Sequence, residues 1–497
     1  MSDTRIYVIG AGFAGRAIAS EIARKGVIGT VVAFLDDDPT KIGTQMDGIP
    51  VLGPIDQVVS LVEKTPADEA LIAIPSASRE ALRRLHTTLT RARFARIRIL
   101  PTVSQIVGDE AHFIQTRQID PQDLLGRTPV SINLRTALSY LRGRRVLITG
   151  AGGSIGSELA RQLLSGGAER LYLLGHGENS IYQIDAELRL LQEEGVGDSA
   201  RIVPIVGELT DRAYLRFLMK RLKADVVFHA AAYKHVPMME ANPVAAIQNN
   251  VFGTLNLIEA AEEAGVGRLV LVSTDKAVQP GNVYGVSKHL AESLFLRRRS
   301  RGSTAAMVVR FGNVLGSRGS ILPLFRRQIE KGGPVTITDA RATRFFMTIP
   351  EAVSLVLQTA GVGDPGELYV LDMGEPISIQ ELAEQMIRFH GYVPGEDILI
   401  REIGLRPGEK LVESLYDSDE RPEDQPSERV MRVCRGRGGA TVGPPGPQEL
   451  DTLLRQLQPV CFFDETRPNE YRNRWKLRSI LRPHYPGLPA PAEEPEF

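Results

Sequence analysis

Residues 144–164 read RRVLITGAGGSIGSELARQLL, an apolar strand that runs into a glycine-rich turn and then into a helix. Val146–Thr149 predict the strand, and apolar residues at helical spacing predict the helix. Gly150 permits a tight turn, Gly153 leaves room for a pyrophosphate, and Gly156 lets the helix pack close to the strand. Phosphates would lie at the helix N-terminus. The cofactor-binding candidates of this turn are Gly150, Gly153, Ser154, Ile155 and Gly156.

Later segments of the same region continue this parallel α/β pattern. Residues 225–229 predict a strand, and the small residues Ala230 and Ala231 after it would let a cofactor pass over the sheet edge. The next predicted helix carries Asn250, a further cofactor-binding candidate. Residues 268–292 then predict a strand, a polar turn and a helix. Together with the glycine turn, these segments indicate one nucleotide-binding catalytic core.

Tyr284 and Lys288 lie four residues apart on the last of these helices. At that spacing they share one face, and an ammonium beside a phenol favours the phenolate. The pair therefore predicts a general base near neutral pH. An isolated YxxxK is more simply an exposed Tyr and Lys pair, but this one follows a dinucleotide turn.

The second strand of the core lies within residues 170–179, RLYLLGHGEN, and ends at Gly175 and His176. An NAD-selective fold usually presents an acidic residue here, which would repel a 2′-phosphate. Its absence favours NADP, with His176 as the cofactor-binding candidate at this position. NAD remains the alternative, because Glu178 could still contact a ribose hydroxyl.

Several motifs between residues 124 and 416 resemble those of a single family. They are GAGGSIGSEL, HAAAYKHVP, STDKAV, YGVSK, RFGNVLGSRGS, TRFFMTIPEA, LDMGEP and RPGEK. In this order they resemble the extended short-chain dehydrogenase/reductase superfamily. Within it they are similar to the CapD-like polysaccharide-biosynthesis family, which includes UDP-N-acetylglucosamine 4,6-dehydratases. Relatives self-associate, so the resemblance also implies a homo-oligomer.

The resemblance implies that UDP-N-acetylglucosamine, or a related UDP-sugar, becomes a 4-keto-6-deoxy sugar nucleotide for surface glycans. In the family pattern Tyr284 takes the O4 proton, Thr274 positions O4, and Lys288 binds the nicotinamide ribose. Asp275 protonates the departing O6, and Lys276 removes the C5 proton. A base needs a lowered pKa, which we expect burial beside the cofactor to give Lys276.

The family motifs also imply a substrate-binding half, assembled mainly after Arg310. Its candidates are Lys234, Asn313, Arg344, Arg406 and Glu409. Arg406 would bind the diphosphate, and Glu409 the ribose hydroxyls. Taken singly, such residues are more often surface charges, and only their place in the motifs argues for substrate contact.

Two other functions remain open for this core. A UDP-sugar 4-epimerase needs the tyrosine and a hydroxyl, but no adjacent acid and base, so Asp275 and Lys276 favour the dehydratase. A dinucleotide-sensing regulator without turnover would keep the fold and lose catalytic residues. The joint presence of Asp275, Lys276, Tyr284 and Lys288 argues against it.

The N-terminal region repeats the strand, turn and helix pattern. Gly10, Gly12 and Gly15 have GxGxxG spacing, and a second strand ends at Asp36, where a ribose hydroxyl could be held. These four residues form a possible second nucleotide site. The resemblance instead implies a Rossmann-like regulatory or structural domain without an assigned reaction.

We therefore expect an α/β protein with two Rossmann-like, doubly wound parallel-sheet domains in tandem. The expected parts are residues 1–105 (N-terminal domain), 106–143 (connector), 144–416 (catalytic domain, substrate-binding after about 310) and 417–497 (a partly disordered tail). Within this tail, residues 471–481 are expected to dock as a helix.

Composition narrows the classes of partner. The 59 basic and 60 acidic residues give a formal net charge of −1, which predicts no nucleic-acid partner. Two cysteines without CxxC spacing and eight scattered histidines predict no metal site. No apolar run nears the roughly 20 residues of a membrane span, which predicts a cytoplasmic protein. Many relatives carry membrane helices, so the alternatives are a naturally soluble member and one trimmed of its anchor.

Overall fold

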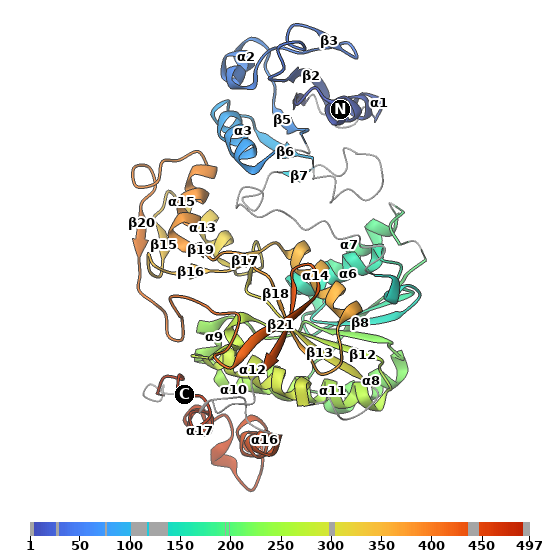
Figure 1. Cartoon of the computed structure of the whole chain (residues 1–497), viewed down its shortest axis with the longest axis vertical. Coiled ribbons are helices and arrows are strands. Elements are labelled where there is room, and N and C mark those ends of the chain that lie inside the picture. Colours follow the sequence, from blue (N-terminus) through green and yellow to red (C-terminus); the bar gives the residue numbers. More distant parts are fainter. Residues whose placement is uncertain are drawn as a thin grey trace. The chain divides into compact units, whose positions relative to one another are not determined.

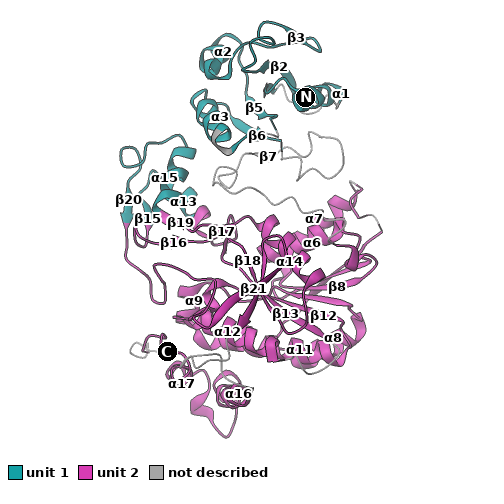
Figure 2. Ribbon diagram, in the orientation of Figure 1, with its two compact units in different colours: residues 1–132, 324–336, 380–401 teal, residues 133–323, 337–379, 402–497 magenta. Residues whose placement is uncertain are grey.

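A computed structural model describes residues 4–25, 29–74, 77–100, 117–118, 138–193, 195–197, 199–297, 304–435 and 447–490. The chain forms two compact units (Figures 1 and 2). Unit 1 comprises residues 1–132, 324–336 and 380–401, and unit 2 the remainder. Most of the predicted connector and the end of the tail at 491–497 lie outside the described residues.

Unit 2 is organised around a nine-stranded sheet in the order β10-β9-β8-β11-β12-β13-β18-β22-β21. The first seven of these strands run parallel. Their bounds are β8 (Arg145–Thr149), β9 (Arg170–Gly175), β10 (Arg201–Val206), β11 (Val226–His229), β12 (Arg268–Val272), β13 (Ala305–Arg310) and β18 (Leu368–Leu371). The strand order reverses between β8 and β11, and such a switch point opens a crevice at the carboxyl ends of the strands.

Helices cover both faces of this sheet, as near-continuous apolar strands require. Figure 1 shows α6, α7 and α14 on one face and α8, α11 and α12 on the other. Their bounds are α6 (Ser154–Ser165), α7 (Glu178–Glu193), α8 (Arg212–Leu222), α9 (Val236–Ala241), α10 (Pro243–Ile247), α11 (Gly253–Glu263), α12 (Val283–Leu296) and α14 (Ile349–Val362). The helix expected to carry Asn250 contains a π-helical turn, η5 (Gln248–Phe252), a feature frequent at functional sites.

The sheet extends past the predicted boundary at residue 416. Strands β21 (Glu420–Ser427) and β22 (Val430–Arg435) form a hairpin, and β22 pairs antiparallel with β18. The sequence of β21, ERPEDQPS, is polar because this strand is an exposed sheet edge. It therefore lacks the apolar pattern by which a strand is predicted.

Unit 1 contains the second predicted Rossmann-like sheet, in the order β2-β1-β5-β6-β7. Strands β1 (Arg5–Ile9), β2 (Thr30–Leu35), β5 (Glu69–Ile72) and β6 (Arg96–Ile99) run parallel, and β7 (Arg117–Gln118) pairs antiparallel with β6. Its helices are α1 (Phe13–Lys25), α2 (Val58–Lys64) and α3 (Arg79–Arg91). The tandem α/β fold is thereby confirmed.

Unit 1 is larger than the predicted domain 1–105, because later parts of the chain join it. Phe389, at the end of α15 (Ile379–Phe389), stacks on His86 with ring centroids 4.2 Å apart. The same phenylalanine packs against the apolar core of the N-terminal sheet. This contact joins residues too far apart in the chain for any local pattern to predict it.

Short elements complete both units. They are β3 (Gln45–Met46), β4 (Ile49–Pro50), η1 (Ile55–Gln57), η4 (Ser139–Leu141), η6 (Asp275–Ala277), β14 (Asn313–Val314), α13 (Ile321–Glu330), β15 (Val335–Ile337), β16 (Thr343–Arg344), β17 (Phe346–Met347), β19 (Ile377–Ser378) and β20 (Ile400–Glu402). The C-terminal segment contains α16 (Pro447–Cys461), η8 (Pro468–Glu470) and α17 (Arg474–Leu481), so the predicted helix within 471–481 is confirmed. Of the helices in the described part of the chain, none combines the length and apolar character needed to cross a bilayer.

Candidate functional site

The glycine turn between β8 and α6 forms a cradle that no larger residue would fit. Gly150 has φ +69°, and a Cβ added there would lie 2.7 Å from the backbone of Ala231. A Cβ on Gly156 would collide with the carbonyl oxygen of Gly150. These contacts hold α6 against β8 with its N-terminus directed at the turn, which is the arrangement that receives a pyrophosphate.

A cavity of about 540 Å³ opens at this turn, within the size range of small-molecule sites. Five predicted cofactor-binding residues line it, namely Gly150, Gly153, His176, Ala230 and Ala231. The loops after β9 and β10, Gln248 and Asn249 of η5, and two arginines, Arg318 and Arg472, supply other parts of the wall. Glycine and alanine walls with two cations suit a dinucleotide with its anionic pyrophosphate.

The remaining predicted cofactor residues do not line this cavity. They are Ser154, Ile155, Gly156, Asn250, Tyr284 and Lys288. Asn250 is 2% exposed, and its side chain accepts from the Tyr233 N–H and donates to the Tyr233 carbonyl and to Ser287 Oγ. It therefore fixes the loop after β11 to the catalytic helix α12, and its amide is satisfied by protein partners.

The polar turn after β12 brings the predicted acid and base together. Asp275 is fully buried, and its Oδ1 accepts from Thr274 Oγ1 at 2.9 Å and from Lys276 Nζ at 3.0 Å. Its other oxygen, Oδ2, is buried without a hydrogen-bond partner among the described residues. This buried carboxyl oxygen is therefore available for a hydrogen bond with a substrate oxygen.

Lys276 is held by more partners than the motif indicated. Its Nζ donates to Asn313 Oδ1 at 3.0 Å and lies 3.8 Å from Glu413 Oε1. Burial alone would lower the pKa of Lys276, but Asp275 and Glu413 outweigh it and raise that pKa. In the protein without ligands Lys276 therefore lacks the lowered pKa that a base needs, because two carboxylates lie beside the ammonium. A lowered pKa beside the bound cofactor stays a prediction.

Tyr284 and Lys288 both lie on α12, as predicted, and both are buried. Burial raises the pKa of Tyr284 to about 12, opposed by Lys276 and a hydrogen bond with Thr274. Burial also lowers the pKa of Lys288 to about 8, and its Nζ donates to the Val272 carbonyl at 2.8 Å. The expectation that Lys288 lowers the tyrosine pKa is not met in this state, where Lys276 is the nearby cation.

The predicted substrate residues divide into two groups. Asn313 contacts Lys276, and Lys234 lies close enough for the Lys276 charge to add to burial in lowering the Lys234 pKa. Arg344 instead donates to the backbone carbonyls of residues 343, 410 and 411, which satisfies its guanidinium. Arg406 is exposed, and its N–H donates to Glu409 Oε2 at 3.1 Å.

The sequence motifs did not identify Glu413 as a residue of the site. It is 7% exposed, and its Oε2 is buried without a hydrogen-bond partner among the described residues. It lies within the stretch GLRPGEKLVESL, but nothing local connects it to Lys276. Only the tertiary fold brings this carboxylate to the turn that contains Lys276.

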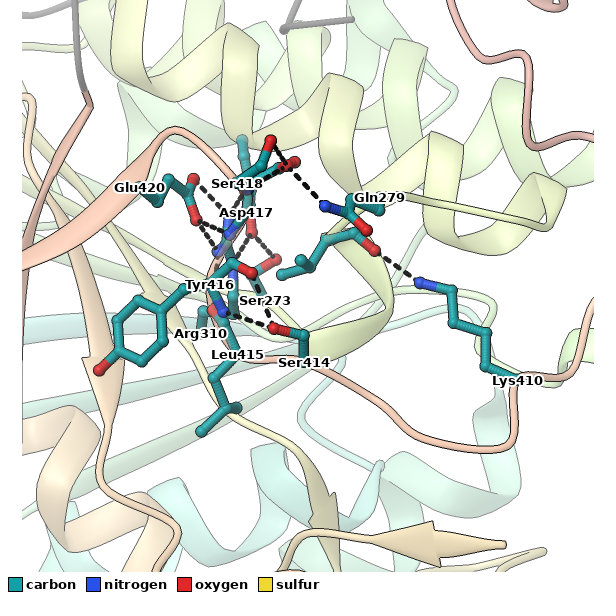
Figure 3. A network of polar contacts seen from close by, with 12 residues as sticks. Ser273, Gln279, Arg310, Lys410, Ser414, Leu415, Tyr416, Asp417, Ser418 and Glu420 are labelled. Carbon is teal, nitrogen blue, oxygen red and sulfur yellow. Dashed lines mark hydrogen bonds and ion pairs between the residues drawn. The ribbon is translucent and has the colours of Figure 1, made fainter. Parts of the chain in front are cut away.

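A buried ion-pair network beneath the site was also missed (Figure 3). Arg310, 1% exposed, bonds Glu292 of α12 at 2.7 Å and Glu420 of β21 at 2.5 Å, and donates to the Leu415 carbonyl at 3.0 Å. Ser273 Oγ, next to the catalytic turn, donates to Glu292 Oε1 at 2.6 Å. The network thereby ties β13, the catalytic helix and the segment 415–420 together.

In unit 1, the Asp36 side chain bonds to the backbone of the glycine loop that contains Gly10 and Gly12. Its Oδ2 accepts from the Ala11 N–H at 2.8 Å and from Lys41 Nζ at 3.0 Å, and its Oδ1 from the Asp38 N–H at 2.9 Å. Although burial opposes it, these hydrogen bonds lower the pKa of Asp36. Gly10, Gly12 and Gly15 stand at the predicted turn, and nucleotide binding there stays a prediction.

Comparison with known proteins agrees with this geometry. Residues 146–435 match the family described as polysaccharide biosynthesis protein, and residues 3–101 match a CoA-binding domain family. The capsular polysaccharide biosynthesis protein CapD of Staphylococcus aureus is 40% identical over 428 residues, 86% of this chain and 70% of that protein.

Two further similarities concern the core. A UDP-N-acetylglucosamine 4,6-dehydratase (inverting) of Campylobacter jejuni is 34% identical over 282 residues, 56% of this chain and 79% of that protein. The X-ray structure of Pen from Bacillus thuringiensis, 33% identical, covers 60% of this chain and 91% of its own with a TM-score of 0.54. The family match covers more than half of the chain and confirms the resemblance drawn from the motifs. The chain therefore belongs to the polysaccharide biosynthesis protein family, within the extended short-chain dehydrogenase/reductases.

Proposed function

We propose that this protein is an NADP-dependent 4,6-dehydratase of UDP-N-acetylglucosamine, cytoplasmic and homo-oligomeric, that supplies surface glycan synthesis. The observation that carries the proposal is the buried Asp275–Lys276 pair, in hydrogen-bond contact with Thr274 and electrostatically coupled to Tyr284. The similarity to a UDP-N-acetylglucosamine 4,6-dehydratase supports the choice of substrate. The glycine and alanine cavity, with no carboxylate at the end of β9, supports NADP.

A bound nicotinamide dinucleotide would hold the hydride between its removal from C4 of the sugar and its return to C6. Tyr284 takes the O4 proton, and Thr274 orients that oxygen. Lys276 removes the C5 proton, made acidic by the ketone at C4. Asp275 protonates O6, which leaves as water. When the hydride returns to C6, the proton that Lys276 removed, or one that it has exchanged with solvent, returns to C5, so the sugar loses one water without net oxidation.

The proton count of the Asp275–Lys276 pair agrees with these roles. The raised pKa of Lys276 favours a proton on its amine in the protein without ligands. Transfer of this proton across the 3.0 Å hydrogen bond would make Asp275 a neutral carboxylic acid and Lys276 a free amine. A substrate that excludes water from the pair favours this neutral form, because burial disfavours charge.

An epimerase remains the rival enzyme. It would use Tyr284 and Thr274 but leave O6 in place. The buried acid Asp275 and base Lys276 would therefore have no role in its reaction. The decisive experiment incubates the protein with UDP-N-acetylglucosamine in deuterated water and analyses the product by mass spectrometry and proton NMR. Loss of one water with deuterium at C5 supports the dehydratase, whereas an unchanged composition with inverted C4 would establish the epimerase.

Two variants sharpen this experiment. Asp275→Asn keeps the shape of the side chain but provides no acid, so we expect water loss to fall by at least about a hundredfold. Lys220→Ala, which changes an exposed lysine on α8, serves as the control. Dinucleotide released from denatured protein, or titrated into it, would distinguish NADP from NAD. If the protein binds a dinucleotide but transforms no UDP-sugar, the sensing role gains support.

A further inference from the structure

The C-terminal segment, residues 447–490, contributes to the dinucleotide cavity although it lies beyond the family match at 146–435. Arg472, between η8 and α17, lines the cavity together with Gln248 and Asn249 of η5. The segment meets η5 directly, where the rings of Phe252 and Phe462 pack edge to face with centroids 5.2 Å apart. Arg472 therefore reaches the cavity along the wall formed by α10 and η5.

This segment is a fixed part of unit 2. Arg478 Nη2 bonds Glu240 Oε2 at 2.8 Å, and Glu240 Oε1 accepts from the Val283 N–H at the start of α12, at 2.7 Å. The hydroxyl of Tyr485 lies 2.9 Å from Nδ1 of His289, the residue after Lys288. The segment thus contacts α12 directly at His289 and indirectly, through Glu240, at Val283, and these two residues flank Tyr284 and Lys288.

Arg472 has a left-handed backbone conformation and an exposed side chain without an ionic partner in the described chain. Its φ is +57°, in the left-handed region that costs a residue with a Cβ, and its N–H donates to the Val460 carbonyl at 2.9 Å. Strained residues of this kind gather at functional sites. The residue is exposed, and its guanidinium contacts Tyr471, with a hydrogen bond to the hydroxyl at 3.3 Å and the ring centroid 5.6 Å away. It is within 4.0 Å of no carboxylate in the described chain.

The position of Arg472 identifies the part of the ligand it faces. The glycine turn and the N-terminus of α6 receive a pyrophosphate, whereas the loops after β9 and β10 face the adenosine. The first residue of α11, Gly253, which directly follows η5, packs against Leu209 of the loop after β10. Arg472 therefore stands on the adenosine side of the cavity.

We propose that Arg472 binds the adenosine half of the dinucleotide, so that the C-terminal segment completes the cofactor site. This inference rests on the dinucleotide part of the proposed function, and not on the sugar substrate. A guanidinium can stack on an adenine face or pair with a 2′-phosphate, and both contacts fasten the same moiety. The segment that carries Arg472 also holds α12, so cofactor binding and the position of the catalytic helix depend on one element.

The test compares Arg472→Ala with Arg482→Ala, an exposed arginine of the same segment outside the cavity. Dissociation constants for NADH and NADPH follow from the fluorescence of each nucleotide. Energy transfer from Trp475, the single tryptophan, reports on the same segment. We expect Arg472→Ala to weaken binding by about tenfold or more, and Arg482→Ala to leave it unchanged.

A second variant keeps the test decisive if Arg472→Ala perturbs the fold. Arg472→Gly removes the side chain and suits the left-handed backbone, so loss of binding in both variants assigns the effect to the guanidinium. A selective loss for NADPH would indicate the 2′-phosphate, and an equal loss for both nucleotides would indicate adenine stacking. Unchanged dissociation constants in both variants would overturn the inference. Dinucleotide binding by the unaltered protein without sugar turnover would instead refute the dehydratase and leave the role of Arg472 intact.

Discussion

Replacement of Arg310 by methionine should destabilise unit 2, and the buried network of Figure 3 sets the size of the effect. Arg310, Glu292 and Glu420 are each no more than 6% exposed, and the guanidinium reaches both carboxylates within 3.2 Å. Although burial alone would lower it, the two carboxylates raise the pKa of Arg310 above its usual value. The variant would leave two buried carboxylates without their cation. Removal of one partner from a buried ion pair costs about 3–5 kcal/mol, which we expect for Arg310→Met.

The loss should depend on pH with a predictable sign. Without Arg310, repulsion and burial raise the pKa of at least one of the two glutamates in the folded state above its value in the unfolded chain. The folded variant then binds more protons than the unfolded chain, so its stability falls as pH rises through the raised pKa. The slope is about 1.4 kcal/mol per pH unit for each proton involved. The deficit of Arg310→Met should therefore be smaller near pH 5 than near pH 8.

Denaturant unfolding monitored by Trp475 fluorescence measures this effect, because the only tryptophan lies in unit 2. The control is the triple variant Arg310→Met, Glu292→Gln and Glu420→Gln, which buries no uncompensated charge and should recover much of the lost stability. Equal midpoints for Arg310→Met and the unaltered protein at both pH values would refute the reasoning. A stability deficit that persists in the triple variant would show that lost packing, and not unpaired charge, causes it.

Three other predictions follow from the site. Lys288→Met should raise the free energy of unfolding at pH 7 by about 3 kcal/mol, since burial lowers the lysine pKa to about 8 from 10.5. Denaturant midpoints at pH 7 and 10 should show this gain shrinking as pH rises, and a constant gain would contradict it. Glu413→Gln should lower the pKa of Lys276 and move the ascending limb of the kcat pH profile to lower pH, and an unshifted limb would count against the contact. Gly150→Ala should abolish dinucleotide binding in fluorescence titrations. The control Gly265→Ala should retain binding, because Gly265 has φ +72° but open space where a Cβ would be added. Equal binding by both variants would show that crowding at the turn is unimportant.

Much of the cofactor site was accessible from local sequence. The turn around Gly150 and the small residues Ala230 and Ala231 were predicted because their constraint is local, namely backbone conformation and close approach. Tyr284 and Lys288 were paired by helical spacing alone. The lowered pKa expected for Tyr284 is not found in the protein without ligands, because burial, and not the lysine one helical turn away, dominates this group.

The tandem α/β architecture, the glycine turn and the predicted Tyr284–Lys288 pair follow from the amino-acid sequence alone, because each is a pattern of adjacent residues or of one helical period. The predicted roles of Thr274, Asp275 and Lys276 rest on the family motif. Only the tertiary structure decided which distant groups surround them. Glu413 at Lys276, Arg310 between Glu292 and Glu420, and Arg472 at the cofactor cavity are contacts between residues far apart in the chain. Charges interact through space, and the distance between two of them depends on how distant elements pack against each other. A local sequence pattern does not contain that information.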